Sequence, residues 1–463
     1  MKRISGLIFA SFAAYLSAGC GSDHDDGARG DCHVAEQTGC DAGQVCENVT
    51  GGGVGCFAPV VVRGRVVEAL TPTTGIKDAL VVARDINGAL VSRSIERSGA
   101  DGAYELAVPA ERAPDGAPTL TKITLRADAQ GFASFPSGLR VALPIDTTKP
   151  VQSNGKWVVE NTSTDVGLDR LASSEGLGTV RGFVRADEPA GTLVVAGATS
   201  ALAARDGAFT LFNVPPGNIE VRGYKAGLQL EPDSVAVESG QTVEGVELMA
   251  SSAPLGSVSG DVSFVDAASH ETSVVLVVKS TFNAALARGE VPVGLRQFPV
   301  MGAYSFEGVP AGEYVVLAAF ENDELVRDPD LAIAGTSIQS VTVGNAPVAV
   351  DGFKITGALD VMAPGAAGPE PVTGTPTFKW ADDSSEDGYD VVVYDTFGNE
   401  IFRDPNVPRV TGSPEVSLTY AGPTLARGYY QFRATSWRVG KGTDATRTYI
   451  SSTEDLKGVF VIQ

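Results

Sequence analysis

One pattern of strand and turn residues occurs three times in this chain, and it limits the fold more than any other feature. Each copy opens on a short stretch rich in glycine and valine, at residues 61–66, 178–184 and 256–262. Each copy later has an aromatic residue after a glycine, then apolar and polar residues in alternation and a Val-Pro pair, at residues 101–110, 206–217 and 302–312. Alternation with a period of two is typical of a half-buried strand. Three ordered copies therefore predict an all-β chain built from tandem β-sandwiches.

The turn that follows the aromatic strand has the same composition in the second and third copies. It contains proline and glycine at residues 214–217 and again at 309–312. Because proline cannot donate a ladder hydrogen bond, the strand must end there, and glycine allows the chain to turn. A second alternating strand then follows, with Ile219 and Val221 on one face. We expect each pair of strands to form a β-hairpin within a meander.

These residues resemble the carboxypeptidase regulatory-like domain, a transthyretin-like sandwich within the Ig-like group of folds. The shared features are a G-x-V opening, a D-G-x-[YF]-x-[LF] strand and a V-P-[AP]-G-x-[YI] turn. The second copy fits best, the first lacks the glycine after Pro109-Ala110 and has an insertion, and the third lacks the aspartate and has a long excursion. The resemblance implies sandwiches over residues 60–170, 178–251 and 256–357. It implies no activity, because the family's regulatory domain is not catalytic.

The last module, residues 372–463, has a different pattern and follows a linker-like stretch at 364–371. Trp380 ends an early alternating strand, and a Gly-Tyr-Tyr-x-Phe-x-Ala strand occurs at 428–434. These features resemble the fibronectin type III sandwich, which implies that Trp380 packs between two sheets. A ligand-stacking role for Trp380 is the alternative. We expect Trp437 at an exposed strand end.

The first residues predict export. Lys2 and Arg3 precede an apolar run at 4–16 that is shorter than the roughly 20 residues a membrane span needs, which is typical of a secretory signal peptide. Residues 16–20, Leu-Ser-Ala-Gly-Cys, resemble the lipobox of bacterial lipoproteins. The resemblance implies cleavage after residue 19 and acylation of Cys20 by diacylglycerol and a fatty acid such as palmitate. A plain secretory signal is the alternative.

The predicted lipid anchor also suggests a location. No aspartate directly follows Cys20, and in diderm lipoproteins such an aspartate tends to retain the protein at the inner membrane. We therefore expect the outer membrane, with the periplasmic and surface faces both open, and residues 20–31 as a lipidated tether. No later apolar run approaches 18 residues, so the expected membrane contact is lipid alone.

The remaining cysteines form one cluster within residues 32–56: Cys32, Cys40, Cys46 and Cys56. An even, tight cluster in an exported chain predicts two disulfides, with three pairings open. The cluster resembles the small Cys-rich modules that follow lipoboxes in deltaproteobacterial surface lipoproteins. A zinc site with His33 is the alternative, but the spacing lacks the C-x₂₋₄-C pair that zinc ribbons use.

The residues that would carry chemistry are scarce. The formal net charge of −21 disfavours nucleic acid as a partner. The chain has three histidines, and only His270 lies beyond the N-terminal segment, so a zinc-hydrolase set or a Ser-His-Asp triad is not expected. We expect no catalytic residue, metal or cofactor. The acidic loop 382–390 has oxygens spaced as in an EF-hand but lacks the final glutamate, so a solvated loop is favoured and weak calcium binding stays open.

Together these features predict a non-catalytic, membrane-anchored lipoprotein that acts as a structural or binding array, for adhesion or as a scaffold, at the cell envelope. Its further partner, a protein or a glycan, is not identified by the sequence. A carbohydrate-binding accessory protein is the alternative, which would need a row of exposed aromatic side chains on one sheet face. A hydrolase is the third hypothesis.

Overall fold

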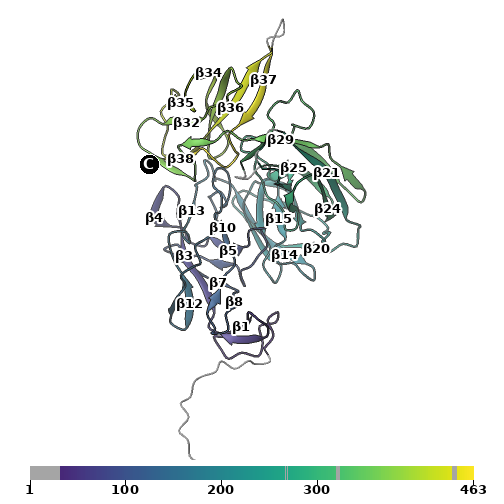
Figure 1. Cartoon of the computed structure of the whole chain (residues 1–463). Helices are drawn as coiled ribbons and strands as arrows, with labels where there is room; N and C mark the ends of the chain where they lie inside the picture. The colour runs from purple at the N-terminus through teal and green to yellow at the C-terminus, as the bar shows by residue number, and fades with distance from the viewer. Residues whose placement is uncertain (1–31, 266, 268, 320–323, 441–445) are drawn as a thin grey trace, which may run out of the picture. The chain divides into compact units, whose positions relative to one another are not determined.

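The computed structural model describes residues 32–265, 267, 269–319, 324–440 and 446–463. Apart from one 3-10 turn, η1 (Lys279–Thr281), all regular structure in these ranges is β, which confirms the predicted all-β class (Figure 1). The described part contains no helix long and apolar enough to cross a membrane. The chain forms two compact units: a Cys-rich unit, residues 32–58 and 111–117, and a sandwich unit, residues 59–110 and 118–463.

The Cys-rich unit is a short hairpin closed by a segment from later in the chain. Strands β1 (Val45–Asn48) and β2 (Val54–Phe57) pair antiparallel, with Cys46 opposite Cys56. Strand β8 (Glu111–Arg112) joins them through a bridge between Val49 and Arg112. The insertion that interrupts the first sequence repeat is therefore part of this unit.

The three repeats have one topology. The opening strand of each copy has two partners. It pairs antiparallel with the strand that contains the aromatic residue after the glycine, and parallel with the last strand of the copy. The three sets are β3 (Val60–Glu68), β7 (Ala103–Val108) and β13 (Val166–Leu168); β14 (Gly178–Arg185), β17 (Ala208–Val214) and β20 (Thr242–Met249); and β21 (Gly256–Val265), β24 (Ala303–Val309) and β29 (Phe353–Gly357). A second sheet packs on each of these sheets across a buried apolar core.

The remaining strands complete these sandwiches. In the first sandwich, the first sheet also has β4 (Thr71–Gly75), β11 (Val151–Ser153) and β12 (Lys156–Val159), and the second has β10 (Thr124–Asp128), β5 (Leu80–Arg84) and β6 (Glu96–Arg97), while β9 (Pro118–Thr119) follows the insertion. The second sandwich adds β16 (Thr199–Leu202), β15 (Leu193–Ala196), β18 (Gly217–Tyr224) and β19 (Asp233–Val237). The third adds β26 (Leu325–Arg327) and β28 (Pro347–Ala349) to its first sheet and has β23 (Arg296–Val300), β22 (Thr272–Val278), β25 (Gly312–Ala318) and β27 (Gln339–Val343) in its second.

The predicted hairpin across the Val-Pro turn is wrong. Strand β17 pairs with β14, whereas β18 pairs with β15 and β19 in the opposite sheet. The turn therefore carries the chain from one sheet to the other, and the same holds for β24 and β25 in the third copy. Proline at this turn, Pro215 in the second copy and Pro310 in the third, ends the strand, but period-two alternation does not specify in which sheet the next strand pairs.

The residue before this turn has a left-handed backbone in two copies. Asn213 has a φ of 61° and Gly308 a φ of 65°, and both lie where the register of the adjoining strand pair shifts. A one-residue bulge of this kind favours glycine or asparagine, because other side chains resist a positive φ. Asparagine adds a side chain that glycine lacks, which becomes important at the contact between sandwiches.

The fourth sandwich includes the stretch that the composition suggested as a linker. One sheet is β30 (Val361–Ala363), β32 (Thr377–Ala381) and β35 (Glu415–Thr419). The other is β31 (Glu370–Val372), β38 (Val459–Ile462), β36 (Gly428–Val439), β33 (Gly388–Asp395) and β34 (Glu400–Pro408), with β37 (Arg447–Ser452) on β36. A Cβ at Gly365 would lie 2.4 Å from the Val459 nitrogen, so the small residues here permit close backbone packing.

The tryptophans show where the sequence reading held and where it failed. Trp380 is fully buried, with its ring edge-on to Tyr389 at 5.3 Å, as the core assignment predicts. Trp437, expected at an exposed strand end, lies within β36 and is only 8% exposed. The guanidinium of Arg447, on the neighbouring strand β37, lies 3.9 Å from the centre of its ring and covers it. Trp157 lies on β12 and is half-buried.

Candidate functional site

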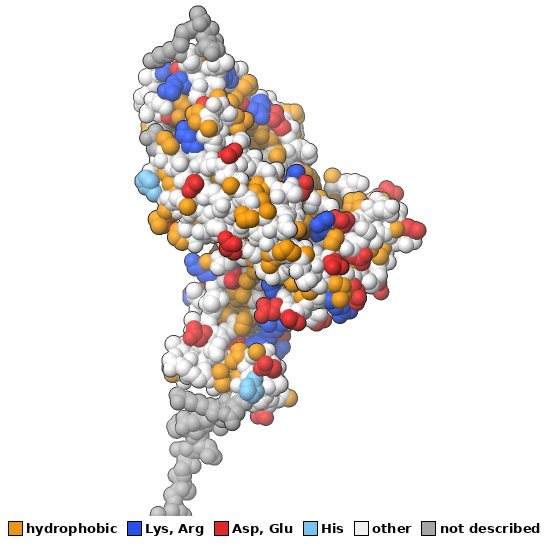
Figure 2. All heavy atoms as spheres, turned by 90° about the vertical axis from the view of Figure 1, so that its right-hand side faces the viewer, with side chains coloured by type: hydrophobic (Ala, Val, Ile, Leu, Met, Phe, Trp, Pro, Cys, Tyr) orange, Lys and Arg blue, Asp and Glu red, His pale blue; other side chains and the backbone are white. Residues whose placement is uncertain are grey.

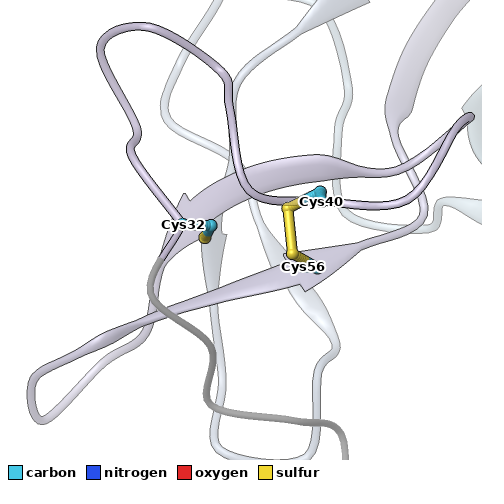
Figure 3. A group of neighbouring side chains, drawn as sticks. All are labelled: Cys32, Cys40 and Cys56. Atoms are coloured by element: carbon cyan, nitrogen blue, oxygen red, sulfur yellow. A yellow bond between two sulfur atoms is a disulfide. The ribbon is translucent and has the colours of Figure 1, made fainter.

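The four clustered cysteines form two disulfides, as predicted. Cys32 pairs with Cys46 and Cys40 with Cys56, which settles the pairing that the sequence left open. Figure 3 shows the Cys40–Cys56 bond with Cys32 beside it. The sulfur atoms of Cys32, Cys40 and Cys56 lie within 4.8 Å of one another, close enough to hold one metal ion. Because a disulfide sulfur is not a thiolate ligand, the oxidised cluster does not fit the zinc alternative.

The predicted lipidation site, Cys20, lies outside the described residues, together with the signal peptide and the tether to residue 31. The acylation of Cys20 therefore stays a prediction.

The two histidines that the structure describes belong to different compact units. His33 is an exposed residue of the Cys-rich unit, and His270 is an exposed residue after β21, with its ring 5.8 Å from that of Phe264. Each is alone in its own unit among the described residues. Neither unit therefore has a pair of described histidines that could bind a metal.

Hydrogen bonds from protein donors hold the acidic loop 382–390 against the end of β36. Tyr389 Oη donates to Asp382 Oδ1 at 2.9 Å, and Ser436 Oγ donates to Asp383 Oδ2 at 2.7 Å. The backbone N–H of Val439 donates to Asp387 Oδ2 at 2.9 Å. Burial, reinforced by the neighbouring aspartates, raises the pKa of Glu386. These carboxylates therefore help to hold the sandwich end together.

Functional groups that the sequence reading missed lie at the contacts between sandwiches. Arg126 of β10 is 1% exposed and joins three sandwiches. Its Nη1 donates to Glu290 Oε1 of the third sandwich at 2.7 Å, and its Nη2 donates to the Ser200 carbonyl of the second at 3.1 Å. Asp128, two residues along β10, completes the ion pair at 2.9 Å. Burial raises the pKa of Glu290, but the charges of Arg126 and Arg84 outweigh it and lower that pKa overall.

A second buried charge cluster joins the third and fourth sandwiches around Asp455. Its Oδ2 lies 2.7 Å from Arg327 Nη2, and its Oδ1 lies 3.3 Å from Arg433 Nη1. Arg288 donates to the Asp455 carbonyl at 3.1 Å and to the Gly138 carbonyl of the first sandwich at 2.6 Å. Burial and the charge of Arg433 lower the pKa of Arg288 to about 10, and Asp455 opposes this shift. Sandwiches that are not consecutive in sequence are thus joined as well.

Asn213 joins the first and second sandwiches mainly through its side chain, and its backbone N–H also donates to Gln130 Oε1 at 3.3 Å. Its Nδ2 donates to the carbonyls of Ala129 at 3.0 Å and Phe132 at 2.9 Å, and its Oδ1 accepts from the Gly131 N–H at 2.7 Å. The only sequence signal was its place in the repeat, where the third copy has Gly308.

Replacing Asn213 with glycine is expected to weaken this contact without disturbing the bulge, because glycine keeps the positive φ. Three lost hydrogen bonds are worth about 2 kcal/mol in total. Hydrogen exchange at the Gly131 amide should accelerate in this variant. The control is Asn154→Gly, an exposed asparagine with a φ of 48°. Equal exchange in both variants would show that the Asn213 side chain does not hold the contact.

Two hollows open on the sandwich unit. The larger, about 640 Å³, lies between the second and third sandwiches, and its charged lining is paired, with Arg222 on Glu220 and Glu313 on Lys279. The smaller, about 450 Å³, lies between the first and second sandwiches. It is lined by three arginines and one carboxylate, beside apolar side chains, and we call it the arginine hollow: Arg93, Arg97, Arg205, Asp206, Leu80, Ile95 and Phe209.

Exposed aromatic side chains are few. Among the described residues, the exposed ones are Phe298 of the third sandwich and Phe397 of the fourth. On the face drawn in Figure 2, acidic, basic and hydrophobic side chains are intermixed. The row of aromatic residues that the carbohydrate-binding alternative needs is not formed by the described residues.

Comparisons with known proteins give only distant structural likenesses. No family model and no curated protein sequence matches the chain. The solved structures it is similar to include the Bacillus anthracis TIE protein, with 11% identity over 84% of this chain and 68% of that one, at a TM-score of 0.16. A streptococcal ancillary pilin has 12% identity over 64% and 98%, and two B repeat units of the Staphylococcus aureus collagen-binding protein have 11% over 85% and 99%, both at a TM-score of 0.16. At these scores the fold assignment depends on the strand pairing of this chain itself.

Proposed function

We propose that this chain is a non-catalytic, lipid-anchored protein of the cell envelope whose β-sandwiches form a structural or binding array. The observation that carries the proposal is the use of its buried charges. Arg126, Glu290 and Asp455 join sandwiches to one another instead of converging on a substrate-sized hollow. Because breaking a buried ion pair from one side is strongly destabilising, these charges support the cohesion of the array.

The remaining support comes from the residues that catalysis would need. The clustered cysteines form disulfides, and the described histidines are exposed, one in each compact unit. The lipobox-like sequence that ends at Cys20 supports anchoring by lipid, with the outer membrane as the proposed location and a protein or glycan as the proposed further partner.

The test is palmitate labelling of the full chain in a diderm bacterium, followed by membrane fractionation and surface proteolysis. We expect the wild type to carry label and fractionate with the outer membrane, and Cys20→Ala to lose both properties. Ser17→Ala is the matched control, since it leaves the acylated cysteine in place. Label that persists in Cys20→Ala would contradict the anchor. Peptidase or esterase turnover that disappears in His270→Ala would contradict the non-catalytic assignment.

A further inference from the structure

We propose that the arginine hollow binds a small organic carboxylate. The hollow brings together side chains from two sandwiches: Arg93 and Arg97 lie on or beside β6 of the first, and Arg205 lies in the turn before β17 of the second. Arg205 Nε donates to the Ser92 carbonyl at 3.3 Å, so one hydrogen bond crosses the rim from the second sandwich to the first. The inference is independent of the lipid anchor.

The charge of the hollow is unusual for this protein. The chain has 35 basic and 56 acidic residues, and many of its arginines have carboxylate partners, as Arg63 and Arg403 do. Arg97 and Arg205 form no ion pair with a carboxylate of the described residues. The one carboxylate in the lining, Asp206, accepts a hydrogen bond from the Ala208 N–H at 3.0 Å. The hollow therefore has an excess of positive charge.

The shape of the guanidinium group indicates which class of anion the hollow would bind. Its planar fork of N–H donors matches the two oxygens of a carboxylate, and such charge-assisted pairs are the strong hydrogen bonds of proteins. The apolar side chains of Leu80 and Ile95 lie beside these donors, which suits a carboxylate on a hydrocarbon or ring skeleton over an inorganic oxyanion.

The size of the hollow and the charge around it limit the ligand further. About 450 Å³ admits a small molecule, and most of the ligand's surface could be covered. A long polyanion would extend over the acidic surface of a chain with a net charge of −21, where it is repelled. A compact anion interacts with the local arginines, because charges more than about 10 Å away are largely screened at 0.1 M salt.

The larger hollow, between the second and third sandwiches, does not compete for this assignment. Its arginine is paired with a carboxylate of the same strand, so it offers no spare cation.

In the experiment, phthalate is titrated into the purified full chain in detergent, and the heat of binding is measured by calorimetry. Dimethyl phthalate, which keeps the ring and loses the charge, and inorganic sulfate, which keeps a charge and lacks the ring, are the matched probes. We expect saturable phthalate binding that weakens as salt is raised, and at least about tenfold weaker binding of each matched probe.

The variants locate the site. Arg97→Gln with Arg205→Gln should weaken phthalate binding at least about tenfold. Arg438→Gln removes one positive charge at an exposed position of the fourth sandwich and should leave the affinity within about twofold. Arg205→Lys keeps the charge but loses the fork, and should give an intermediate affinity. Thermal melting of each variant tests whether it is folded.

Three results would overturn the proposal: no saturable phthalate binding, sulfate that binds as tightly as phthalate, or equal weakening by the double variant and by Arg438→Gln. The first result would show that the hollow is not a binding site, and the second that the organic skeleton is not recognised. The third would show that the variants act through net charge alone. None of these three results bears on the palmitate labelling of Cys20, so the two proposals are tested separately.

Discussion

Replacing Asp455 with asparagine is expected to lower the free energy of unfolding by about 3–5 kcal/mol at pH 7, because a buried ion pair broken from one side leaves its other charges uncompensated. The variant keeps the shape of the side chain but leaves Arg327 and Arg433 facing a neutral group. Urea-induced unfolding measures the loss. Asp360→Asn, at an exposed position of the same sandwich, is the control and should change stability by less than about 0.5 kcal/mol.

The same cluster gives a pH dependence with a definite sign. Burial raises the pKa of Asp455, but the charges of Arg327 and Arg433 outweigh this effect and lower that pKa overall. A carboxyl group with a lower pKa in the folded than in the unfolded state stabilises the fold above its unfolded pKa, about 3.9. That stability is lost as the pH falls through the folded-state pKa.

The wild type should therefore lose more stability than Asp455→Asn when the pH falls from 5 to about 2, so the difference between them narrows. Parallel pH curves for the two proteins would contradict an ionised Asp455 at the junction. A loss below about 1 kcal/mol at pH 7 would contradict its role in joining the third and fourth sandwiches.

The sequence predicted the features that a local pattern encodes and missed those that depend on distant partners. Period-two alternation in three copies identified strands of the first three sandwiches, and the alternating strand that ends at Trp380 identified this buried residue of the fourth. Local composition also identified the disulfide cluster, because four cysteines lie within 25 residues of one another. These are short-range signals, and each is visible in a window of a few tens of residues.

The missed features depend on partners far away in the chain. Arg126 and Glu290 are 164 residues apart, and Arg327 and Asp455 are 128 apart, so no periodicity relates them. The hairpin error had a related cause: alternation shows that a segment is a strand but does not specify which neighbour it pairs with. Only the side chains at the contacts carry that information, and a single sequence does not reveal which of its many charged residues become buried.

The Cys-rich unit depends on such a distant partner as well. Arg112 is fully buried, and its Nε and Nη2 each lie 2.7 Å from Glu47 Oε2. Its guanidinium also lies 5.0 Å from the centre of the Phe57 ring and donates to the Ala58 carbonyl at 2.6 Å. A unit this small has little apolar core, so the disulfides and this ion pair must supply much of its stability.

Replacing Glu47 with alanine should therefore destabilise the Cys-rich unit by about 3–5 kcal/mol, since Arg112 would stay buried without its carboxylate. The readout is the rate at which dithiothreitol reduces the two disulfides, which rises when the unit opens. Glu36→Ala, at an exposed position of the same unit, should leave that rate unchanged.

A double replacement distinguishes the destabilisation caused by an unpaired buried charge from the stabilisation that the ion pair itself provides. In Glu47→Met with Arg112→Met, no charge is left buried, and the reduction rate should return most of the way to that of the wild type, because apolar side chains of similar volume replace buried ion pairs at little cost. If the double variant is reduced as fast as Glu47→Ala, the hydrogen bonds of Arg112 to the backbone, and not its ion pair, hold the insertion at 111–117 on the hairpin. Either result ties the stability of the disulfide module to a segment that the sequence repeat placed in the first sandwich.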